Sequence, residues 1–275
     1  MRRIVWLGVL LGGLFGGSVS AMEHRAWTEL LQRHVQPFNE GRATAVDYAG
    51  FADQRAELTD YLDALSAVTE PEFEQWSSDT QLAFLINAYN AWTVELILTA
   101  YPDLDSIRDL GSLFRSPWKR EFIPLLGQER SLDEIEHEMI RGSGRYNEPR
   151  IHFAVNCASI GCPALLTEAF EADTLEQQLD QATRAFLSDR SRNRWAGEGV
   201  EVSSIFRWYR DDFASGWQGT NRLGEFLALY ADELGVPDNQ RERLATEQVP
   251  IRFLDYDWAL NDVNSRSVAN MPREN

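Results

Sequence analysis

Apolar residues recur at three- and four-residue spacing along much of the first half of the chain. Residues 27–35 and 55–68 follow this pattern, and Leu58, Leu62 and Leu65 share one face of the second segment. A period near 3.6 residues predicts an amphipathic helix in each place.

A third segment of the first half, residues 82–102, is apolar on nearly every side. This pattern is typical of a helix that is buried in the core. A capping box at residues 78–81 predicts where this helix begins, and Pro102 ends it. Asn87 and Asn90, three residues apart, interrupt the apolar surface on one side of the helix.

The second half of the chain mixes helical and extended patterns without strict alternation. Helices are predicted at residues 131–141, which open on a second capping box, at 174–187 and at 221–234, and strands at 122–126, 151–156, 200–202 and within 250–261. Many helices with few strands predict an α+β fold, a mostly helical single domain with a small, largely antiparallel sheet.

The first 21 residues resemble a secretory signal peptide. Arg2 and Arg3 precede an apolar run at residues 4–17, and small residues up to Ala21 suit a cleavage site. The run is shorter than the roughly 20 residues that a membrane-spanning helix needs. We therefore expect secretion across the inner membrane, to the periplasm, with no stable membrane span after signal cleavage.

The remaining chain contains no linker, repeat or low-complexity run, which predicts a single domain at residues 22–261. A polar, disordered tail is predicted at residues 262–275.

Charge and missing motifs narrow the function classes. The chain has 26 basic and 43 acidic residues and a net charge of −17, which repels phosphate backbones and argues against nucleic acid as a partner. It has no P-loop, dinucleotide glycine motif, Gly-x-Ser-x-Gly elbow or His-Glu-x-x-His motif. We expect no cofactor, and an unidentified small molecule or peptide as partner.

The candidate chemistry is concentrated in the segment HFAVNCASIGCP, residues 152–163, which contains both cysteines. If residues 151–156 form a strand, alternation places Cys157 on the apolar face opposite His152, where a cysteine is most simply a core residue. Cys162 precedes Pro163, which could begin a helical turn whose dipole lowers the pKa of the thiol. Cys162 is therefore the candidate nucleophile and His152 its base.

Three asparagines are candidates for orienting the imidazole, namely Asn87, Asn90 and Asn156. The competing interpretation is structural, since buried asparagines commonly bond the backbone of irregular loops.

Two other interpretations of the cysteines stay open. In an oxidising compartment Cys157 and Cys162 could form a disulfide, provided that their Cα atoms approach within about 7 Å. A zinc site of His152, the two cysteines and His137 or an aspartate is disfavoured, because none of the familiar paired spacings is present. We therefore expect no metal.

Several blocks of the chain resemble the domain of unknown function 547 family. They are residues 84–90, 131–137, 150–163, 204–209, 212–213 and 256–261, in the family's order. The likeness covers roughly residues 79–261 and departs at Trp92, where smaller aliphatic residues are usual. The family is functionally uncharacterised, so the resemblance supplies no reaction.

The chain is also loosely similar to papain-like and transglutaminase-like cysteine enzymes, in which a helix-borne cysteine faces a strand-borne histidine. Here the long buried helix carries Asn87 and Asn90 instead, so the thiol would come from the loop after the strand.

Two functions follow as hypotheses. The first is a cysteine-dependent hydrolase or acyl transferase acting on an amide, ester or thioester. The alternative is a non-catalytic binding or scaffold module with a Cys157–Cys162 disulfide. In either case four tryptophans could line a ligand groove, namely Trp92, Trp118, Trp208 and Trp258.

Overall fold

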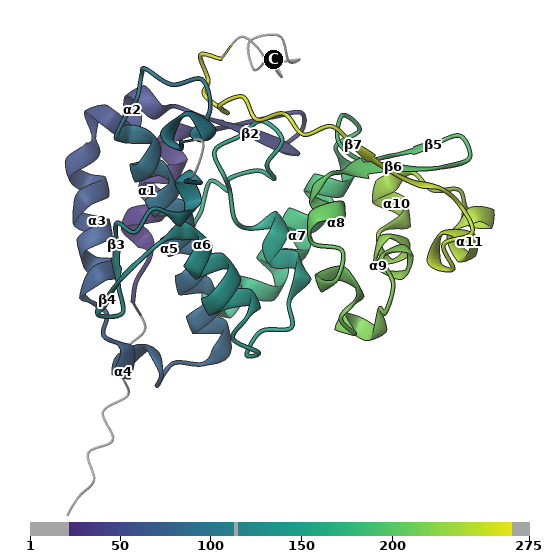
Figure 1. Ribbon diagram of the computed structural model, residues 1–275, viewed down its shortest axis with the longest axis horizontal. Helices are drawn as coiled ribbons and strands as arrows, with labels where there is room; N and C mark the ends of the chain where they lie inside the picture. The colour runs from purple at the N-terminus through teal and green to yellow at the C-terminus, as the bar shows by residue number, and fades with distance from the viewer. Residues whose placement is uncertain (1–21, 113–114, 266–275) are drawn as a thin grey trace, which may run out of the picture.

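The computed structural model describes residues 22–112 and 115–265 (Figure 1). The predicted signal peptide and residues 266–275 of the predicted tail lie outside the described residues. Among the helices that are described, none is long and apolar enough to cross a bilayer.

The first half of the chain is a helical bundle around one buried helix, α5 (Ser78–Leu98). The helices around it are α1 (Arg25–His34), α2 (Tyr48–Asp53), α3 (Arg55–Ala67) and α4 (Glu70–Phe73). The helices predicted at 27–35, 55–68 and 82–102 are thus confirmed. The cap of α5 is Ser77, whose side chain accepts a hydrogen bond from the backbone N–H of Thr80, one residue before the predicted box.

Short strands and single turns complete this half. The strands form two antiparallel hairpins, β1 (Val35–Phe38) with β2 (Ala43–Val46) and β3 (Ile123–Leu125) with β4 (Gln128–Arg130). Two 3₁₀ turns lie between α5 and β3, η1 (Ile107–Leu110) and η2 (Pro117–Lys119). The capping box predicted at Ser131 and Glu134 is confirmed, and it opens α6 (Leu132–Glu134), which continues as the π-helix η3 (Ile135–Arg141).

The second half packs helices against a small mixed sheet. Its helical elements are η4 (Pro149–Phe153), η5 (Ala172–Thr174), α7 (Leu175–Ser188), α8 (Ile205–Trp208), η6 (Asp212–Ala214), η7 (Trp217–Gly219), α9 (Leu223–Leu229), α10 (Ala231–Leu234), η8 (Asp238–Gln240) and α11 (Arg241–Ala245). In the sheet, β6 (Gly199–Ser203) pairs antiparallel with β5 (Arg194–Ala196) and parallel with β7 (Ile251–Leu254). The molecule is a mostly helical α+β protein, as predicted.

The strand predicted at residues 151–156 is wrong, because this segment begins with the 3₁₀ helix η4. Pro149 at its first turn is preset for helical φ, and the side chain of Glu148 accepts a hydrogen bond from the backbone N–H of Arg150. Arg150 is buried between Glu148 and Glu176 of α7. The apparent alternation misled because the segment is buried on every side, His152 and Asn156 included.

The helical turn predicted at Pro163 is also wrong. Residues 163–166 are not helical, and the carbonyl oxygens of Cys162 and Pro163 accept hydrogen bonds from Arg192 and Asn156 instead of from a following turn. Cys162 therefore does not lie at a helix N-terminus.

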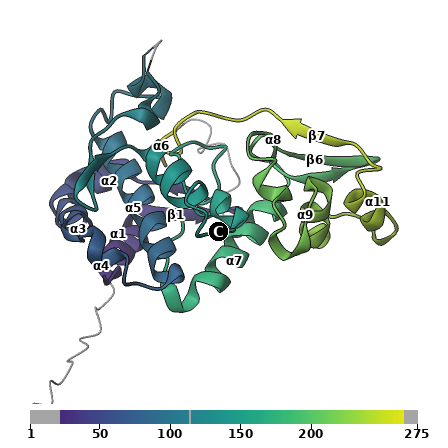
Figure 2. The same cartoon turned by 60° about the horizontal axis from the view of Figure 1, so that its bottom comes forward.

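Two apolar cores meet at η4. The larger core surrounds α5 and includes Ile151 and Ala154, whereas Phe153 belongs to the core of the second half. Figure 2 shows α7 between the bundle and the part that contains β6, β7, α9 and α11. His152, between Ile151 and Phe153, thus lies at the junction of the two cores.

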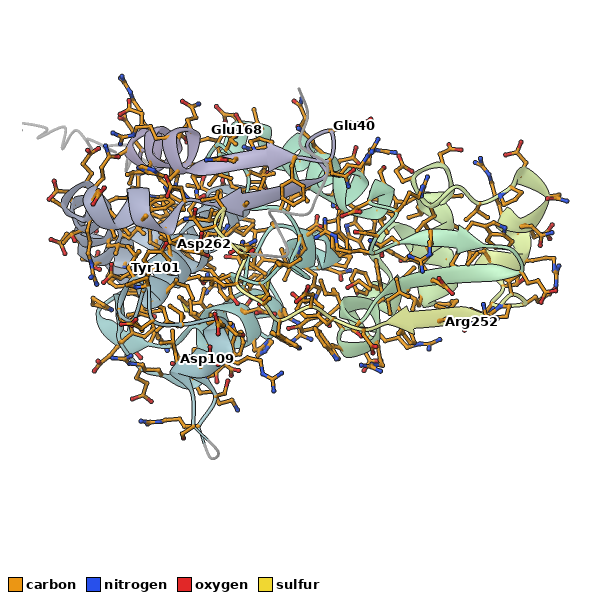
Figure 3. All side chains as sticks on the ribbon, turned by 90° about the horizontal axis from the view of Figure 1, so that it is seen from above. Glu40, Tyr101, Asp109, Glu168, Arg252 and Asp262 are labelled. Carbon is orange, nitrogen blue, oxygen red and sulfur yellow. A yellow bond between two sulfur atoms is a disulfide. The ribbon has the colours of Figure 1, made fainter. Side chains whose placement is uncertain are left out.

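The segment after β7 connects the two halves of the molecule. Figure 3 places Arg252 of β7 at one end of it and Asp262 at the other, beside Tyr101. Asp262 is buried and forms a parallel bridge with Val46 of β2. This strap, residues 255–262, crosses the cysteine loop on its way.

Candidate functional site

A cavity of about 230 Å³ opens beside the junction of the two cores. Aromatic side chains form much of its wall, namely Tyr89, Trp118, Trp208, Tyr209, Tyr256 and Trp258. Its polar side chains include Asp133, Glu136, His137, His152 and Cys157. A mostly aromatic concave site with a few polar groups is the usual form of a small-molecule site.

His152 is held between a carboxylate and an aromatic ring. Its Nε2 lies 2.7 Å from Oδ2 of Asp212 in η6. The ring of Tyr209, directly after α8, stacks on the imidazole with centroids 3.8 Å apart. One ring nitrogen and the ring plane are therefore fixed by residues that follow His152 by more than fifty positions.

Arg141, at the end of η3, holds Asp212 from the other side. Its Nε donates to Oδ2 at 2.6 Å and its Nη2 donates to Oδ1 at 3.0 Å, a bidentate pair. Arg141 also contacts Nδ1 of His137 at 2.8 Å. The π-helix, a distortion frequent at functional sites, thus contributes both a cavity residue and the anchor of the carboxylate.

The ionisation of the pair follows from burial and charge. Burial lowers the pKa of His152 despite its bond to Asp212. Burial alone would raise the pKa of Asp212, but His152 and Arg141 hold it well below its usual range. The arrangement is thus a neutral imidazole whose Nε2–H donates to an ionised carboxylate, which leaves Nδ1 as the basic nitrogen.

Glu136 lies on the same wall as His137 and is buried. Burial raises the pKa of Tyr89 and Tyr209, and the nearby carboxylate of Glu136 raises both pKa values further. These two phenols are therefore protonated at neutral pH.

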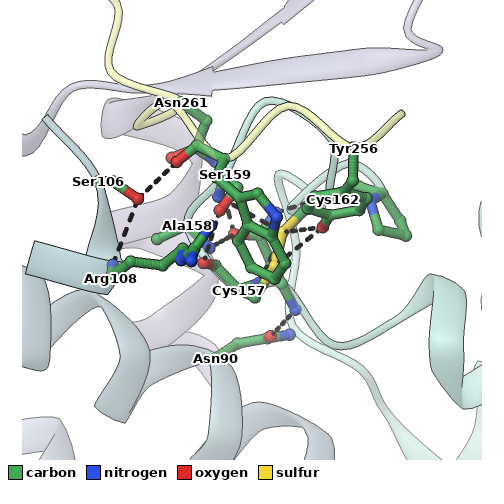
Figure 4. Close-up of a disulfide and its surroundings, with 12 residues drawn as sticks. Asn90, Ser106, Arg108, Cys157, Ala158, Ser159, Cys162, Tyr256 and Asn261 are labelled. Atoms are coloured by element: carbon green, nitrogen blue, oxygen red, sulfur yellow. Dashed lines mark hydrogen bonds between the residues drawn. A yellow bond between two sulfur atoms is a disulfide. The ribbon is translucent and has the colours of Figure 1, made fainter. Parts of the chain in front are cut away.

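Cys157 and Cys162 form a disulfide, with Cα atoms 6.1 Å apart. Figure 4 shows the ring of Tyr256 beside the two sulfur atoms. The Tyr256 hydroxyl lies 3.1 Å from Sγ of Cys157 and 3.2 Å from Sγ of Cys162. Cys157 is half-buried and lines the cavity, whereas Cys162 is buried.

The strap holds the loop between the cysteines through backbone hydrogen bonds. The N–H groups of Ile160 and Gly161 donate to the carbonyl oxygens of Ala259 and Asp257, both at 2.9 Å. A Cβ on Gly161 would lie 2.9 Å from the ring of Tyr256, so only glycine allows this close approach.

The three asparagines of the sequence analysis bond backbone groups. Asn87 donates to the carbonyl oxygen of Phe170 and accepts from its N–H, at 2.8 and 2.9 Å. Asn90 pairs in the same way with the carbonyl oxygen of Ala154 and the N–H of Asn156, at 2.9 and 2.8 Å. The side chain of Asn156 binds Pro163 and Ala158 within the loop.

The structure thus brings together only part of the predicted set. His152 and Cys157 line one cavity, and Asn90 and Asn156 support the loop from below, as Figure 4 shows for Asn90. The contact of the imidazole Nε2 is Asp212 rather than an asparagine.

Three of the four predicted groove tryptophans line the cavity, namely Trp118, Trp208 and Trp258. Trp92 instead packs edge-to-face on Phe122, and its Nε1 has no hydrogen-bond partner.

Sequence reasoning missed most partners of His152. Asp212, Arg141, Tyr209 and Glu136 are far from it along the chain or on other elements, and no local spacing links them. The available signal was that Glu136, Tyr209 and Asp212 each lie inside a short block of the resemblance to the domain of unknown function 547 family.

Within residues 22–112 and 115–265, no group of three or more His, Cys, Asp or Glu side chains is placed to hold a metal ion.

Comparison with known protein families gives a match to part of the chain. Residues 73–187 match the family described as "Protein of unknown function, DUF547". No curated protein and no solved structure matches the chain. The matched range contains Cys157, Cys162, His152 and Arg141, but it ends before Asp212.

Proposed function

We propose, on the geometry of the site, that this protein is a cysteine-dependent hydrolase or acyl transferase acting on an amide, ester or thioester. The match of residues 73–187 to the DUF547 family supplies no reaction, because that family is one of unknown function. The observation that carries the proposal is the chain of hydrogen bonds from Arg141 through Asp212 to His152. His152 lines a cavity that Cys157 also lines. A base with a fixed tautomer that shares a cavity with a cysteine is a combination that nucleophilic acyl transfer uses.

The geometry favours Cys157 over Cys162 as the nucleophile, because Cys157 borders the cavity and Cys162 is buried. Once the disulfide is reduced, His152 takes the proton of the Cys157 thiol and the thiolate attacks the carbonyl carbon of the substrate. The imidazolium then protonates the leaving group as its bond to the acyl carbon breaks. Water or an acceptor then attacks the acyl carbon of the thioester, with His152 again removing the proton. The bond between the acyl carbon and Sγ of Cys157 breaks, and Cys157 leaves as a thiolate that takes the proton back from His152.

Asp212 acts by positioning in this scheme. Its carboxylate fixes the Nε2–H tautomer and stabilises the imidazolium that forms, while Arg141 keeps it ionised. The aromatic wall supplies the apolar contact surface for the acyl group or the leaving group.

The two cysteines provide a matched test. A panel of activated esters and thioesters is assayed with the Cys157→Ser and Cys162→Ser variants, with and without dithiothreitol. We expect Cys162→Ser to hydrolyse a substrate without reductant, because its remaining thiol cannot be blocked by the partner cysteine. Cys157→Ser should be inactive under both conditions, and wild-type rates in Cys157→Ser would refute the assignment.

The second candidate is a non-catalytic binding or scaffold module, and the closed disulfide is the observation that favours it. In this case both single cysteine variants lose stability and neither hydrolyses any member of the panel. A small aromatic ligand would then quench tryptophan fluorescence equally in the wild type and in His152→Ala.

We also propose that the protein is secreted across the inner membrane, on the basis of the signal-like residues 1–21 and of a disulfide that suits an oxidising compartment. Cell fractionation with N-terminal sequencing tests this. A cytoplasmic protein that retains Met1 would refute it.

A further inference from the structure

The Cys157–Cys162 disulfide presents its two sulfur atoms to very different surroundings, and we propose that it is redox-active, exchanging with an external dithiol through attack on Cys157. This thiol–disulfide exchange goes beyond the acyl transfer proposed above. Only its consequence, that reduction frees the nucleophile, rests on that proposed function.

The Sγ of Cys162 is surrounded by hydrogen-bond donors. The backbone N–H of Cys157 donates to it at 3.0 Å and that of Ser159 at 3.4 Å. The hydroxyl of Tyr256 lies between the two sulfur atoms, 3.2 Å from Sγ of Cys162 and 3.1 Å from Sγ of Cys157, and burial raises the pKa of Tyr256, so this hydroxyl keeps its proton. The two backbone N–H groups donate to Cys162, which therefore has more donors around it than the shared hydroxyl alone gives to Cys157.

Those donors suit a thiolate. Hydrogen bonds to the charged form of an acid favour that form, and a buried anion needs such partners in place of water. In thiol–disulfide exchange, the sulfur that leaves does so as a thiolate, and it leaves faster when its thiolate is more stable. Cys162 is therefore the better leaving group of the pair.

Cys157 is the sulfur that a reductant can reach. It is half-buried at the wall of the cavity, whereas Cys162 is buried with 3% of its surface exposed. The greater exposure of Cys157 and the greater stability of the Cys162 thiolate thus both favour attack of the reductant on Cys157.

The exchange takes two steps. A thiolate of the dithiol attacks Sγ of Cys157, a new S–S bond forms, and the Cys157–Cys162 bond breaks with its electron pair on Cys162. The second thiol of the reductant then loses its proton and attacks the reductant's own sulfur in the mixed disulfide. Cys157 departs with the electron pair and takes up a proton. The dithiol is oxidised to a disulfide, and the protein gains two electrons.

The loop keeps its shape by contacts other than the S–S bond. The strap bonds Ile160 and Gly161, and a bridge joins Ser159 to Leu260. Asn156 closes the loop from within by bonding the N–H of Ala158 and the carbonyl oxygen of Pro163. Reduction can therefore proceed in the folded protein, and the donors around Cys162 stay in place.

The first test uses the wild-type protein and measures only the reduction of its disulfide. Oxidised protein is incubated with dithiothreitol at neutral pH, with and without denaturing urea, and free thiols are alkylated and counted by mass spectrometry. We expect both thiols to appear under native conditions at a rate close to that in urea. A disulfide that is reduced only after unfolding would overturn the proposal.

The second test separates the two sulfurs. Cys162→Ser, which retains Cys157, should form a mixed disulfide with oxidised glutathione at least tenfold faster than Cys157→Ser. In Cys157→Ser, the thiolate absorbance of Cys162 should persist to a lower pH than that of a free cysteine. The pH at which half of this absorbance is lost is the titration midpoint of Cys162. Adding Tyr256→Phe to Cys157→Ser should raise the midpoint, because the hydroxyl that donates to the thiolate is gone. Adding Tyr209→Phe, a change in a cavity tyrosine that contacts neither sulfur, should not.

The proposal that the reductant attacks Cys157 and that Cys162 leaves would be refuted in two ways. One is equal rates of reaction with oxidised glutathione in Cys162→Ser and Cys157→Ser. The other is a titration midpoint of Cys162 that Tyr256→Phe leaves unchanged. Because neither test measures hydrolysis, a failure of the proposed acyl-transfer function leaves these outcomes unaffected.

Discussion

Asp212 joins the two halves of the molecule through charge, so replacing it with asparagine is the sharpest perturbation of the site. The carboxylate accepts two hydrogen bonds from Arg141 and one from His152. Asp212→Asn keeps the volume of the side chain but removes its charge. The NH₂ group of the new amide would face either the guanidinium or the imidazole N–H, both of which are donors.

The size of the effect follows from the exposure of the pair. Removing one partner of a fully buried ion pair costs about 3–5 kcal/mol. The side chains of Arg141 and Asp212 are 27% and 24% exposed. Solvent screening at such partly exposed sites lowers the expected loss for Asp212→Asn to about 2 kcal/mol.

Urea unfolding at neutral pH, followed by tryptophan fluorescence, measures this loss. Asp211→Asn is the matched control, because it makes the same change in charge at the exposed neighbouring residue. The pKa of Asp212 is lowered in the folded protein, so its contribution is present above the unfolded value of about 3.9 and is lost as pH falls toward the folded value. The difference in unfolding free energy between the wild type and Asp212→Asn should therefore become smaller as the pH falls below about 3.9.

Nitrogen NMR of the His152 imidazole gives a second measurement. We expect the Nε2–H tautomer alone in the wild type and a mixture of the Nε2–H and Nδ1–H tautomers in Asp212→Asn. If Asp212→Asn unfolds at the same urea concentration as Asp211→Asn and keeps a single tautomer, the carboxylate neither anchors the halves nor orients His152.

Three further predictions concern the surroundings of the site and the core. Gly161→Ala forces a methyl group against the ring of Tyr256 and should lower the unfolding free energy by about 1–3 kcal/mol in denaturant titration, the cost of overpacking; an unchanged midpoint would contradict the close contact. Asn90→Ala leaves a buried N–H and a buried carbonyl of the cysteine loop without partners. It should lower the unfolding free energy by about 2–4 kcal/mol in the same titration. A loss no larger than that of an Asn→Ala change at an exposed position would show that these two hydrogen bonds do not stabilise the loop. Burial lowers the pKa of His24 to about 4, so the unfolded state binds its proton first as pH falls from about 6.5, and the protein loses up to about 3 kcal/mol from this group by the folded value. His24→Gln should flatten the pH dependence of unfolding over that interval, and equal slopes for the two proteins would show that His24 is not the cause.

The sequence alone determined the longer helices and the segment in which the candidate site residues are concentrated. The apolar period of residues 55–68 and 82–102 and the capping box at Ser131 follow from local rules, since each depends only on residues within a few positions. The concentration of His152 and both cysteines in twelve positions also located the segment without any tertiary information.

Only the tertiary structure decided how that segment folds and what its side chains contact. The alternation of apolar and polar residues at 151–156 predicted a strand. The segment is instead enclosed by two cores, and Arg150 forms an ion pair with Glu176 of α7. Because every side chain of the segment is buried, the alternation did not separate a buried face from an exposed one. The sequence left two interpretations of the asparagines open, orienting the imidazole or bonding backbone groups. They bond backbone groups, since a buried irregular loop must satisfy its own N–H and carbonyl groups. Asp212 and Tyr256 reach the site from 60 and 99 positions beyond His152 and Cys157, and contacts at such separation exist only after the chain has packed.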